Sequence, residues 1–274
     1  MPRGLDHIVH AVRDLDAAAE LYRRLGFTVG ARNRHPRAWG TQNHIVQMPG
    51  TFIELLALAD ESGIVPHSPR QFSFGAFNRD FLERRQGLSM LVLEGRGAPD
   101  AEAFRAAGIG DFELYEFERE AKRSDGTPLK VSFALAFASD SLAPETGFFT
   151  CQHRRPENFW NPAFQQHANG VENVAGVVAV AEQPSRHRDF LLAFTGAASA
   201  HDTGDGFTID LPRGAIELIT PAAFERRFGL PAPDASRRAR LAVLRFSGRA
   251  LAAGRQSTMG AVLLFEPACG GNAR

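Results

Sequence analysis

Short apolar segments alternate with amphipathic ones along the first 60 residues of the chain. Residues 5–12 are predicted to form a strand, because apolar and β-branched residues fill this segment. Asp14 suits the N-cap of a helix over residues 15–25, where apolar residues recur at helical spacing, and Gly26 suits the position after its end. Three further strands are predicted, at residues 27–30, 41–48 and 52–59. The pattern therefore predicts a β-α-β-β-β unit.

The same order of elements recurs further along the chain. A second unit is predicted over residues 88–152, with a short helix over residues 99–107. A third unit begins with a strand over residues 174–180, and a degenerate fourth lies between residues 240 and 266. We therefore expect an α+β protein made of tandem βαβββ modules, two in each half of the chain.

Two turn-rich segments separate the predicted units. Residues 64–78 contain two prolines and three phenylalanines, which predicts a loop that packs against the rest of the protein. Residues 154–170 contain two further prolines and end in an Asn-Gly turn. The second segment predicts a division into residues 1–165, with two modules, and residues 166–274, with one full and one degenerate module.

Composition excludes several classes of partner. The chain has 31 basic and 31 acidic residues, so its charge gives no case for binding nucleic acid or an anionic membrane. Its aliphatic runs are too short to cross a bilayer, and its first residues enter a strand pattern at once, without room for a signal peptide. Cys151 and Cys269 are far apart in the sequence, which favours a reducing compartment. We expect a cytoplasmic protein.

Two polar residues stand inside apolar strands. His7 lies in the first predicted strand and Glu54 in the fourth. A buried carboxylate needs a partner, because an unpaired charge in an apolar setting is very costly. An imidazole nitrogen and a carboxylate oxygen are natural ligands of a divalent metal. If the strands bring the two together, the chain has half of a metal site.

The sequence resembles the vicinal oxygen chelate superfamily, and within it the glyoxalase-like domain group. The resemblance covers residues 4 to about 180. It rests on these segments of the printed sequence: Gly4-Leu5-Asp6-His7-Ile8-Val9-His10-Ala11-Val12, Asp14-Leu15-Asp16-Ala17-Ala18, Leu21-Tyr22-Arg23-Arg24-Leu25-Gly26-Phe27, Gly40-Thr41-Gln42-Asn43, Phe52-Ile53-Glu54-Leu55-Leu56 and Arg155-Pro156-Glu157-Asn158-Phe159-Trp160. It implies paired modules whose mixed and antiparallel sheets curl into half-barrels around a cleft, with helices outside.

The resemblance also implies a metal site. The metal of this superfamily is usually held by a His or Gln on the first strand and a Glu on the last strand of each module. His7 and Glu54 match these positions in the first module. The second module departs from the pattern: Ser89 and Met90 stand where a His is expected, and Cys151, Gln152 and His153 stand in place of a clear Glu. The third ligand is then Gln152 or His153, and the third module keeps Glu217 but has Ala175 in the His position.

Each candidate ligand has a structural alternative. His7 and Glu54 could instead form a buried hydrogen bond that only organises the barrel. Strand alternation places Cys151 and His153 on one face and Gln152 on the other, which leaves the choice between His153 and Gln152 open. Cys151 is better explained as a small buried apolar side chain than as a nucleophile. Glu217, without a His partner, is better explained as a residue that lines a pocket.

Two further groups are candidates for substrate binding. Arg34, His35 and Arg37 could bind a substrate carboxylate, although charged loop residues are commonly just solvated. Phe159 and Trp160 could line an apolar pocket, or could equally serve to pack a long loop.

The function that the resemblance implies is that of a metal-dependent enzyme acting on a small oxygenated metabolite. Lyase or isomerase chemistry leads, with dioxygenase chemistry less favoured. Glu54 would be a ligand and also the catalytic base, and the divalent metal could be Zn, Ni, Mn or Fe. The alternative is a metal-free protein of the bleomycin-resistance type that sequesters a small molecule. In either case we expect a monomer or a homodimer.

Overall fold

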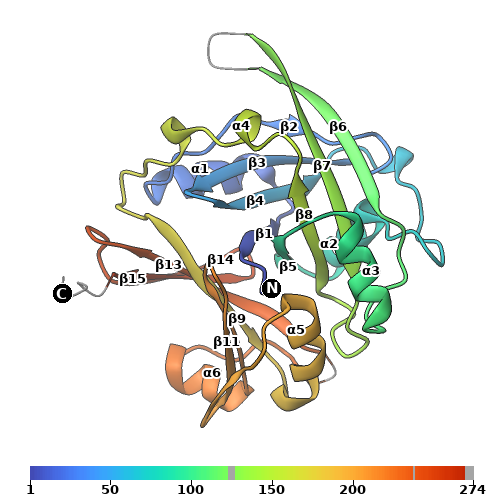
Figure 1. Cartoon of the computed structure of the whole chain (residues 1–274). Helices are drawn as coiled ribbons and strands as arrows, with labels where there is room; N and C mark the ends of the chain where they lie inside the picture. Colours follow the sequence, from blue (N-terminus) through green and yellow to red (C-terminus); the bar gives the residue numbers. More distant parts are fainter. Residues whose placement is uncertain (123–126, 237, 269–274) are drawn as a thin grey trace.

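The structure is a computed structural model that describes residues 1–122, 127–236 and 238–268, with the side chains of 121 and 122 left out. Cys269 lies outside the described residues. The chain folds into an α+β protein with two curled sheets, and Figure 1 shows the N-terminal half of the chain above the C-terminal half. In the described ranges, no helix is both long enough and apolar enough to pass through a bilayer.

The first sheet contains two βαβββ modules. Module one consists of β1 (Leu5–Ala11), α1 (Leu15–Arg24), β2 (Asn33–Arg34), β3 (Thr41–Met48) and β4 (Thr51–Leu58). Module two consists of β5 (Gly87–Glu94), α3 (Ala98–Ala106), β6 (Tyr115–Lys122), β7 (Pro128–Ala138) and β8 (Gly147–His153). The spatial order is β2-β3-β4-β1-β5-β8-β7-β6, with β1 antiparallel to β5 at the centre. This arrangement confirms the predicted tandem modules.

The second sheet repeats the design with fewer helices. Module three consists of β9 (Asn173–Val180), the 3₁₀ helix η3 (Pro184–His187), α5 (Arg188–Thr195), β10 (His201–Thr203), β11 (Gly206–Asp210) and β12 (Ala215–Ile219). Module four keeps only strands, namely β13 (Arg240–Gly248), β14 (Gly254–Thr258) and β15 (Ala261–Pro267), and α6 (Pro221–Phe228) precedes it. The order is β10-β11-β12-β9-β13-β15-β14.

Segments between the modules form short helices. The 3₁₀ helix η1 (Glu61–Gly63) and α2 (Phe74–Arg84) join modules one and two. The segment between the two sheets contains α4 (Pro156–Phe159) and the 3₁₀ helix η2 (Pro162–Phe164). The sheets thus divide between residues 153 and 173, and the division at residue 165 stays a prediction, because nothing tests whether either half folds alone.

Two local predictions were wrong. Residues 27–30 form no strand, because the Phe27 ring packs into the core beside Tyr22 and Phe246, and the paired residues are instead Asn33 and Arg34. The predicted loop over residues 64–78 contains the start of α2, where the Ser73 side chain accepts a hydrogen bond from the amide of Ala76. The predictions of a helix after Asp14 and of a glycine just past its end were correct, and Gly26 has a φ of +84°.

The two sheets pack through a shared core. Ile8 and Leu91 of the first sheet belong to the same buried cluster as Val177 and Phe207 of the second. The imidazole of His10 joins the two sheets as well, because Nε2 lies 3.0 Å from the Met259 carbonyl oxygen. Burial lowers the pKa of His10 to about 4, so the ring is neutral at physiological pH. The outer face of β1 is therefore structural, and its inner face is left for the cleft.

The inner faces of the two sheets differ. Buried side chains of α6, including Phe224 and Phe228, pack onto Val178 and Val243 and fill the face of the second sheet. In the first sheet, α2 covers only part of the face, and a hollow remains between the strands of module one and those of module two. The candidate site lies in this hollow.

Candidate active site

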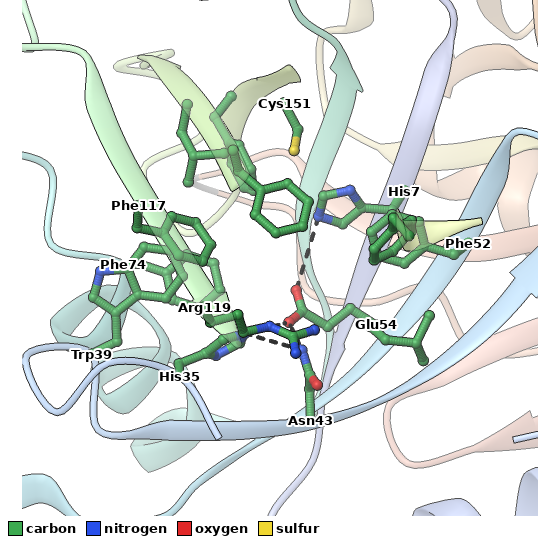
Figure 2. A pocket seen from close by; sticks show the side chains of 15 residues that line it. His7, His35, Trp39, Asn43, Phe52, Glu54, Phe74, Phe117, Arg119 and Cys151 are labelled. Carbon is green, nitrogen blue, oxygen red and sulfur yellow. Dashed lines mark hydrogen bonds and ion pairs between the residues drawn. The ribbon is translucent and has the colours of Figure 1, made fainter. Parts of the chain in front are cut away.

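A small cleft, partly open to solvent, lies against the inner face of the first sheet. Its walls are mainly aromatic, and a few polar side chains converge at one side (Figure 2). Such a combination is typical of small-molecule sites. The lining residues are His7, His35, Trp39, Asn43, Ile45, Phe52, Glu54, Phe74, Phe117, Arg119, Phe133, Leu135, Phe149, Cys151 and Phe159.

Glu54 is the carboxylate of the cleft. It lies on β4 between buried apolar residues, and its side chain is 6% exposed. Its Oε1 atom accepts a hydrogen bond from Asn43 Nδ2 and lies 3.4 Å from His35 Nε2. Its Oε2 atom lies 3.9 Å from His7 Nε2 and makes no hydrogen bond to the described residues. One oxygen is thus anchored and the other is available for chemistry.

His7 faces Glu54 from β1 and is fixed on two sides. Its ring stacks on Phe52 with a centroid distance of 4.2 Å, and its Nδ1 atom lies 2.5 Å from Asp6 Oδ1. With the hydrogen on Nδ1 donated to Asp6, the Nε2 lone pair points toward Glu54. A carboxylate behind the ring is the usual partner of a histidine that binds a metal.

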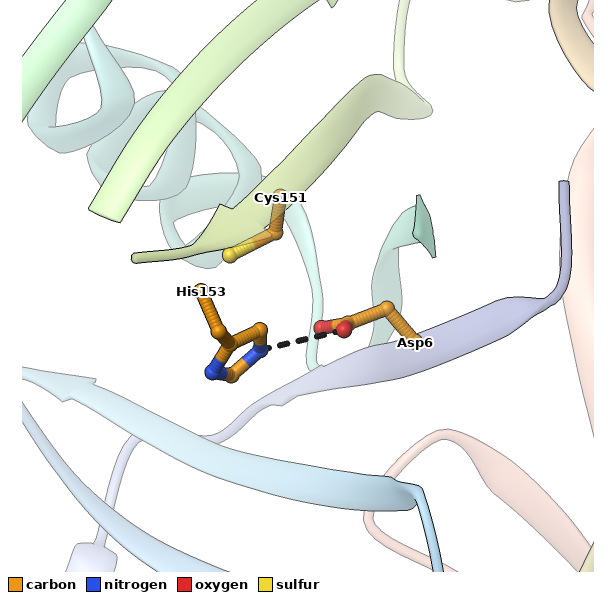
Figure 3. A group of neighbouring side chains, drawn as sticks. All are labelled: Asp6, Cys151 and His153. Atoms are coloured by element: carbon orange, nitrogen blue, oxygen red, sulfur yellow. Dashed lines mark hydrogen bonds and ion pairs between the residues drawn. The ribbon is translucent and has the colours of Figure 1, made fainter. Parts of the chain in front are cut away.

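Asp6 joins two imidazoles. Its Oδ2 atom lies 3.0 Å from His153 Nε2 (Figure 3), while its Oδ1 atom accepts a hydrogen bond from His7 Nδ1. Burial alone would raise the pKa of Asp6, but the adjacent His153 and His7 rings hold it at about 2, so the side chain is ionised. The Nδ1 atom of His153 is buried and has no hydrogen-bond partner among the described residues.

His35 supports Glu54 from the side opposite His7 (Figure 2). Its Nδ1 atom lies 2.8 Å from Thr41 Oγ1, and its Nε2 atom lies 3.0 Å from Asn43 Nδ2. Burial lowers the pKa of His35, which favours the neutral ring. A neutral His35 that donates to Thr41 accepts from Asn43, so the second hydrogen of the Asn43 amide is directed at Glu54.

The donor atoms of His7 and Glu54 fit one divalent metal. Two ligand atoms that each lie about 2.0–2.2 Å from a tetrahedral zinc ion are about 3.4 Å apart. The observed 3.9 Å between His7 Nε2 and Glu54 Oε2 is slightly wider, so a small side-chain movement brings both atoms to one ion. Both side chains belong to β1 and β4, which pair in parallel.

A second group with metal-binding side chains lies beside the first. Atoms of Asp6, Cys151 and His153 lie within 4.8 Å of one another. However, both oxygens of Asp6 already accept hydrogen bonds. Burial, with Asp6 and Glu54 close by, raises the pKa of the Cys151 thiol well above its usual value, whereas a metal binds the thiolate. The His7–Glu54 pair is therefore the better fit.

The remaining predicted residues are distributed over several places. His35 and Phe159 line the cleft, and Trp160 packs beside His153 at its rim. Gln152 lies next to Gly97 at the start of α3, and Arg34 and Arg37 are exposed. Glu217 lies on the second sheet, 2.9 Å from Arg227 of α6. Of the substrate-binding candidates, the structure thus brings His35 and Phe159 to the cleft.

Strand register identifies the equivalents of the His7–Glu54 pair in the other modules. Val9 pairs with Glu54 in module one, Val92 pairs with Phe149 in module two and Val178 pairs with Glu217 in module three. Counting two residues back along each first strand places Met90 and Gly176 at the position of His7, so the prediction of Ala175 for this position was wrong by one residue. Module two therefore has an apolar pair where module one has a polar one.

Three polar residues of the site were missed in the sequence. Asp6 precedes His7 inside a fully buried strand. Because a buried carboxylate needs a partner, its place in this strand could have indicated that it belongs to the site. Asn43 occupies a buried position on β3 and was noted only as part of a motif. Arg119 is a charged residue on the inner face of β6, where alternation with Phe117 was the signal.

Comparisons with known proteins agree with this fold. A family described as a glyoxalase-like domain matches residues 5–195. A hypothetical protein from Staphylococcus aureus matches at 14% identity and a TM-score of 0.73, covering 97% of this chain and 99% of that one. A mutant 4-hydroxymandelate synthase from Streptomyces coelicolor matches at 12% identity and a TM-score of 0.50, covering 90% and 72%.

A methylmalonyl-CoA epimerase from Mycobacterium tuberculosis matches at 21% identity and a TM-score of 0.39, covering 57% of this chain and 92% of that one. No curated protein matches the chain. The family match covers more than half of the chain, including both modules of the first sheet. The chain belongs to the glyoxalase-like domain family.

Proposed function

We propose that the protein is a lyase- or isomerase-type enzyme that moves a proton on a small oxygenated metabolite, with Glu54 as the proton acceptor. One observation carries this proposal: the Oε1 atom of Glu54 is anchored by Asn43, while Oε2 faces the cleft without a hydrogen bond to the described residues. A positioned carboxylate with one free oxygen is suited to general base catalysis.

His7 and Glu54 are the residues that would hold a divalent metal, with Zn, Ni, Mn and Fe as the candidate ions. When bound, such an ion supplies a Lewis acid that stabilises negative charge developing on substrate oxygens. The Oε2 atom of Glu54 would be the ligand of the metal and is also the proposed acceptor of the proton. The proton-exchange experiment is therefore run both with and without each metal.

The residues of the cleft divide the proposed reaction between them. Glu54 Oε2 takes a proton from the carbon next to a carbonyl group, and the bonding electron pair moves toward the carbonyl oxygen. Return of the proton to a neighbouring atom gives an isomer, and departure of a group from the adjacent carbon gives a lyase product. Asn43 and His35 keep the carboxylate in place, and the aromatic walls exclude water.

Solvent exchange tests this proposal without knowledge of the natural substrate. The purified protein is incubated in deuterated water with a panel of small ketones, aldehydes and oxo acids, and deuterium at the carbon next to the carbonyl is followed by NMR. We expect exchange with at least one compound. In Glu54→Gln the exchange rate should fall by about 10²- to 10⁴-fold, the usual contribution of a general base.

Glu217→Gln is the matched control. Glu217 occupies the same strand position in module three, but it pairs with Arg227 and lies outside the cleft. This variant should keep the wild-type exchange rate. Full exchange in Glu54→Gln, or an equal loss in both variants, would show that Glu54 is not the base.

A metal-free binding protein is the second candidate. It is favoured by the apolar side chains Met90 and Phe149, which replace the polar pair in module two. Tight binding of a small molecule, with no exchange in the presence of any added metal, would support this alternative. We propose for either function a cytoplasmic monomer or homodimer, and light scattering on the purified protein decides between the two assemblies.

A further inference from the structure

Arg119 is the charged residue of the aromatic wall. On β6, Phe117 and Arg119 line the cleft, whereas the alternate residues Glu116 and Glu118 pair with Arg154 and Lys130 on the outer face. Among the described residues that module two contributes to the lining, Arg119 alone is charged. Arg119 also lines a second hollow, which shares Ile45 and Phe159 with the cleft.

The guanidinium of Arg119 has few partners among the described residues. Within them it forms one hydrogen bond, from Nη1 to Asn33 Oδ1 at 3.3 Å, although the group has five N–H donors. No carboxylate oxygen lies within 4.0 Å of it in the described ranges. Burial lowers the pKa of Arg119 and the charge of Glu54 opposes that effect, so the cation is partly desolvated without a direct counter-ion.

A chain of hydrogen bonds connects Arg119 to Glu54. Arg119 donates to Asn33 Oδ1, Asn33 Nδ2 donates to Asn43 Oδ1 at 3.2 Å, and Asn43 Nδ2 donates to Glu54 Oε1. The cation and the proposed base are thus held at a fixed separation by two amides. A molecule bound to Arg119 at one end would present another part to Glu54.

We propose that the cleft binds a small organic acid with an aromatic or bulky apolar body, whose carboxylate pairs with Arg119. The guanidinium can form two parallel hydrogen bonds to a carboxylate. The apolar body lies against Phe117, Phe133 and Phe149, and the carbon that loses its proton lies beside Glu54. The position of the reacting carbon rests on the proposed function, whereas the recognition of the carboxylate does not.

Arg119 could instead serve only as a distant counter-charge for Glu54. The two explanations differ in their effect on ligands. A counter-charge gives no preference between an acid and its neutral amide, whereas a carboxylate-binding residue does. The preference between matched acids and amides is therefore the quantity to measure.

The experiment uses the full-length protein and two pairs of probes, phenylacetate with phenylacetamide and 3-phenylpropionate with its amide. Binding is followed by calorimetry and by tryptophan fluorescence, because Trp39 lines the cleft. We expect an acid to bind about ten- to hundredfold more tightly than its amide, the range for hydrogen bonds to a charged group. Arg119→Gln should remove this preference while the affinity for the amide stays the same.

Two further variants serve as controls. Arg119→Lys keeps the charge but loses the paired donors, so it should keep part of the preference, and it serves if Arg119→Gln does not fold. Arg154→Gln removes a cation from the outer face of the sheet and should keep the full preference for acids over amides. Equal binding of acid and amide by the wild type, no binding of any probe near its solubility limit, or an unchanged preference without Arg119 would each overturn the inference.

Glu54→Gln separates this inference from the proposed function. That variant should lose proton exchange and keep the preference for acids. If exchange survives in Glu54→Gln but the acid preference still depends on Arg119, the base assignment is wrong and the ligand class stands. If exchange depends on Glu54 but acids are not preferred, only the ligand class is wrong.

Discussion

Modules one and two have the same strand order and form opposite walls of one cleft, yet their inner faces differ in chemistry. Module one contributes the polar side chains His7, His35, Asn43 and Glu54, beside the apolar side chains of Trp39, Ile45 and Phe52. Module two contributes phenylalanines, a leucine, a buried thiol and a single cation. The polar wall is suited to proton transfer and metal binding, and the aromatic wall to shape recognition and exclusion of water.

The difference arises at equivalent strand positions. Glu54 and Phe149 pair with corresponding valines of β1 and β5, so the repeat places a carboxylate in one module and a phenyl ring in the other. Module three, in the second sheet, has a carboxylate at this position, but that carboxylate does not line the cleft. Its Glu217 pairs with Arg227, while α6 fills the inner face. The repeat therefore fixes where a side chain points, and the local surroundings decide its role.

The largest expected effect comes from removing a ring of the aromatic wall. Phe149 is 2% exposed, and its ring contacts those of His7 and Phe137. In Phe149→Ala the free energy of unfolding should fall by about 3–5 kcal/mol, because a buried ring is replaced by a cavity. Urea denaturation measures the change, and Phe164→Ala, at an exposed ring, is the control. A loss comparable with that of the control would mean that the wall is loosely packed.

The sequence predicted the modules well because they depend on local periodicity. The polar pair His7 and Glu54 was visible because both residues interrupt apolar strands. Asn43 of the polar wall and Arg119 of the aromatic wall were not visible in this way, because they connect to Glu54 only through the pairing of β3 with β4 and the hydrogen bonds of Asn33. Register between distant strands also placed Phe149, rather than Cys151 or His153, opposite Val92, and no local pattern contains that information.

The support of His7 by Asp6 gives the second prediction. Asp6→Asn keeps the shape but removes the charge that fixes the Nδ1 hydrogen of His7 and the Nε2 hydrogen of His153. Metal affinity, measured by titration, and the rate of proton exchange should each fall by about 10- to 100-fold, the usual cost of losing such a partner.

Asp140→Asn is a matched control for this prediction. Asp140 is also a buried partner of a histidine, His187, at 2.5 Å, but the pair lies outside the cleft. Its loss should lower stability without changing metal affinity or exchange. If both variants lose metal equally, the effect of Asp6→Asn comes from destabilisation rather than from the orientation of His7.

The smallest effect is expected at Cys151, the thiol of the aromatic wall. Burial, followed by the charges of Asp6 and Glu54, raises its pKa, so the side chain stays a neutral thiol rather than a thiolate nucleophile or ligand. Cys151→Ala should therefore keep wild-type metal affinity and exchange, with about 1 kcal/mol lost in the free energy of unfolding. Loss of bound metal would instead assign the metal to the group of Asp6, Cys151 and His153. The polar wall would then extend into module two through His153 of β8, whose Nδ1 atom is buried without a hydrogen-bond partner among the described residues.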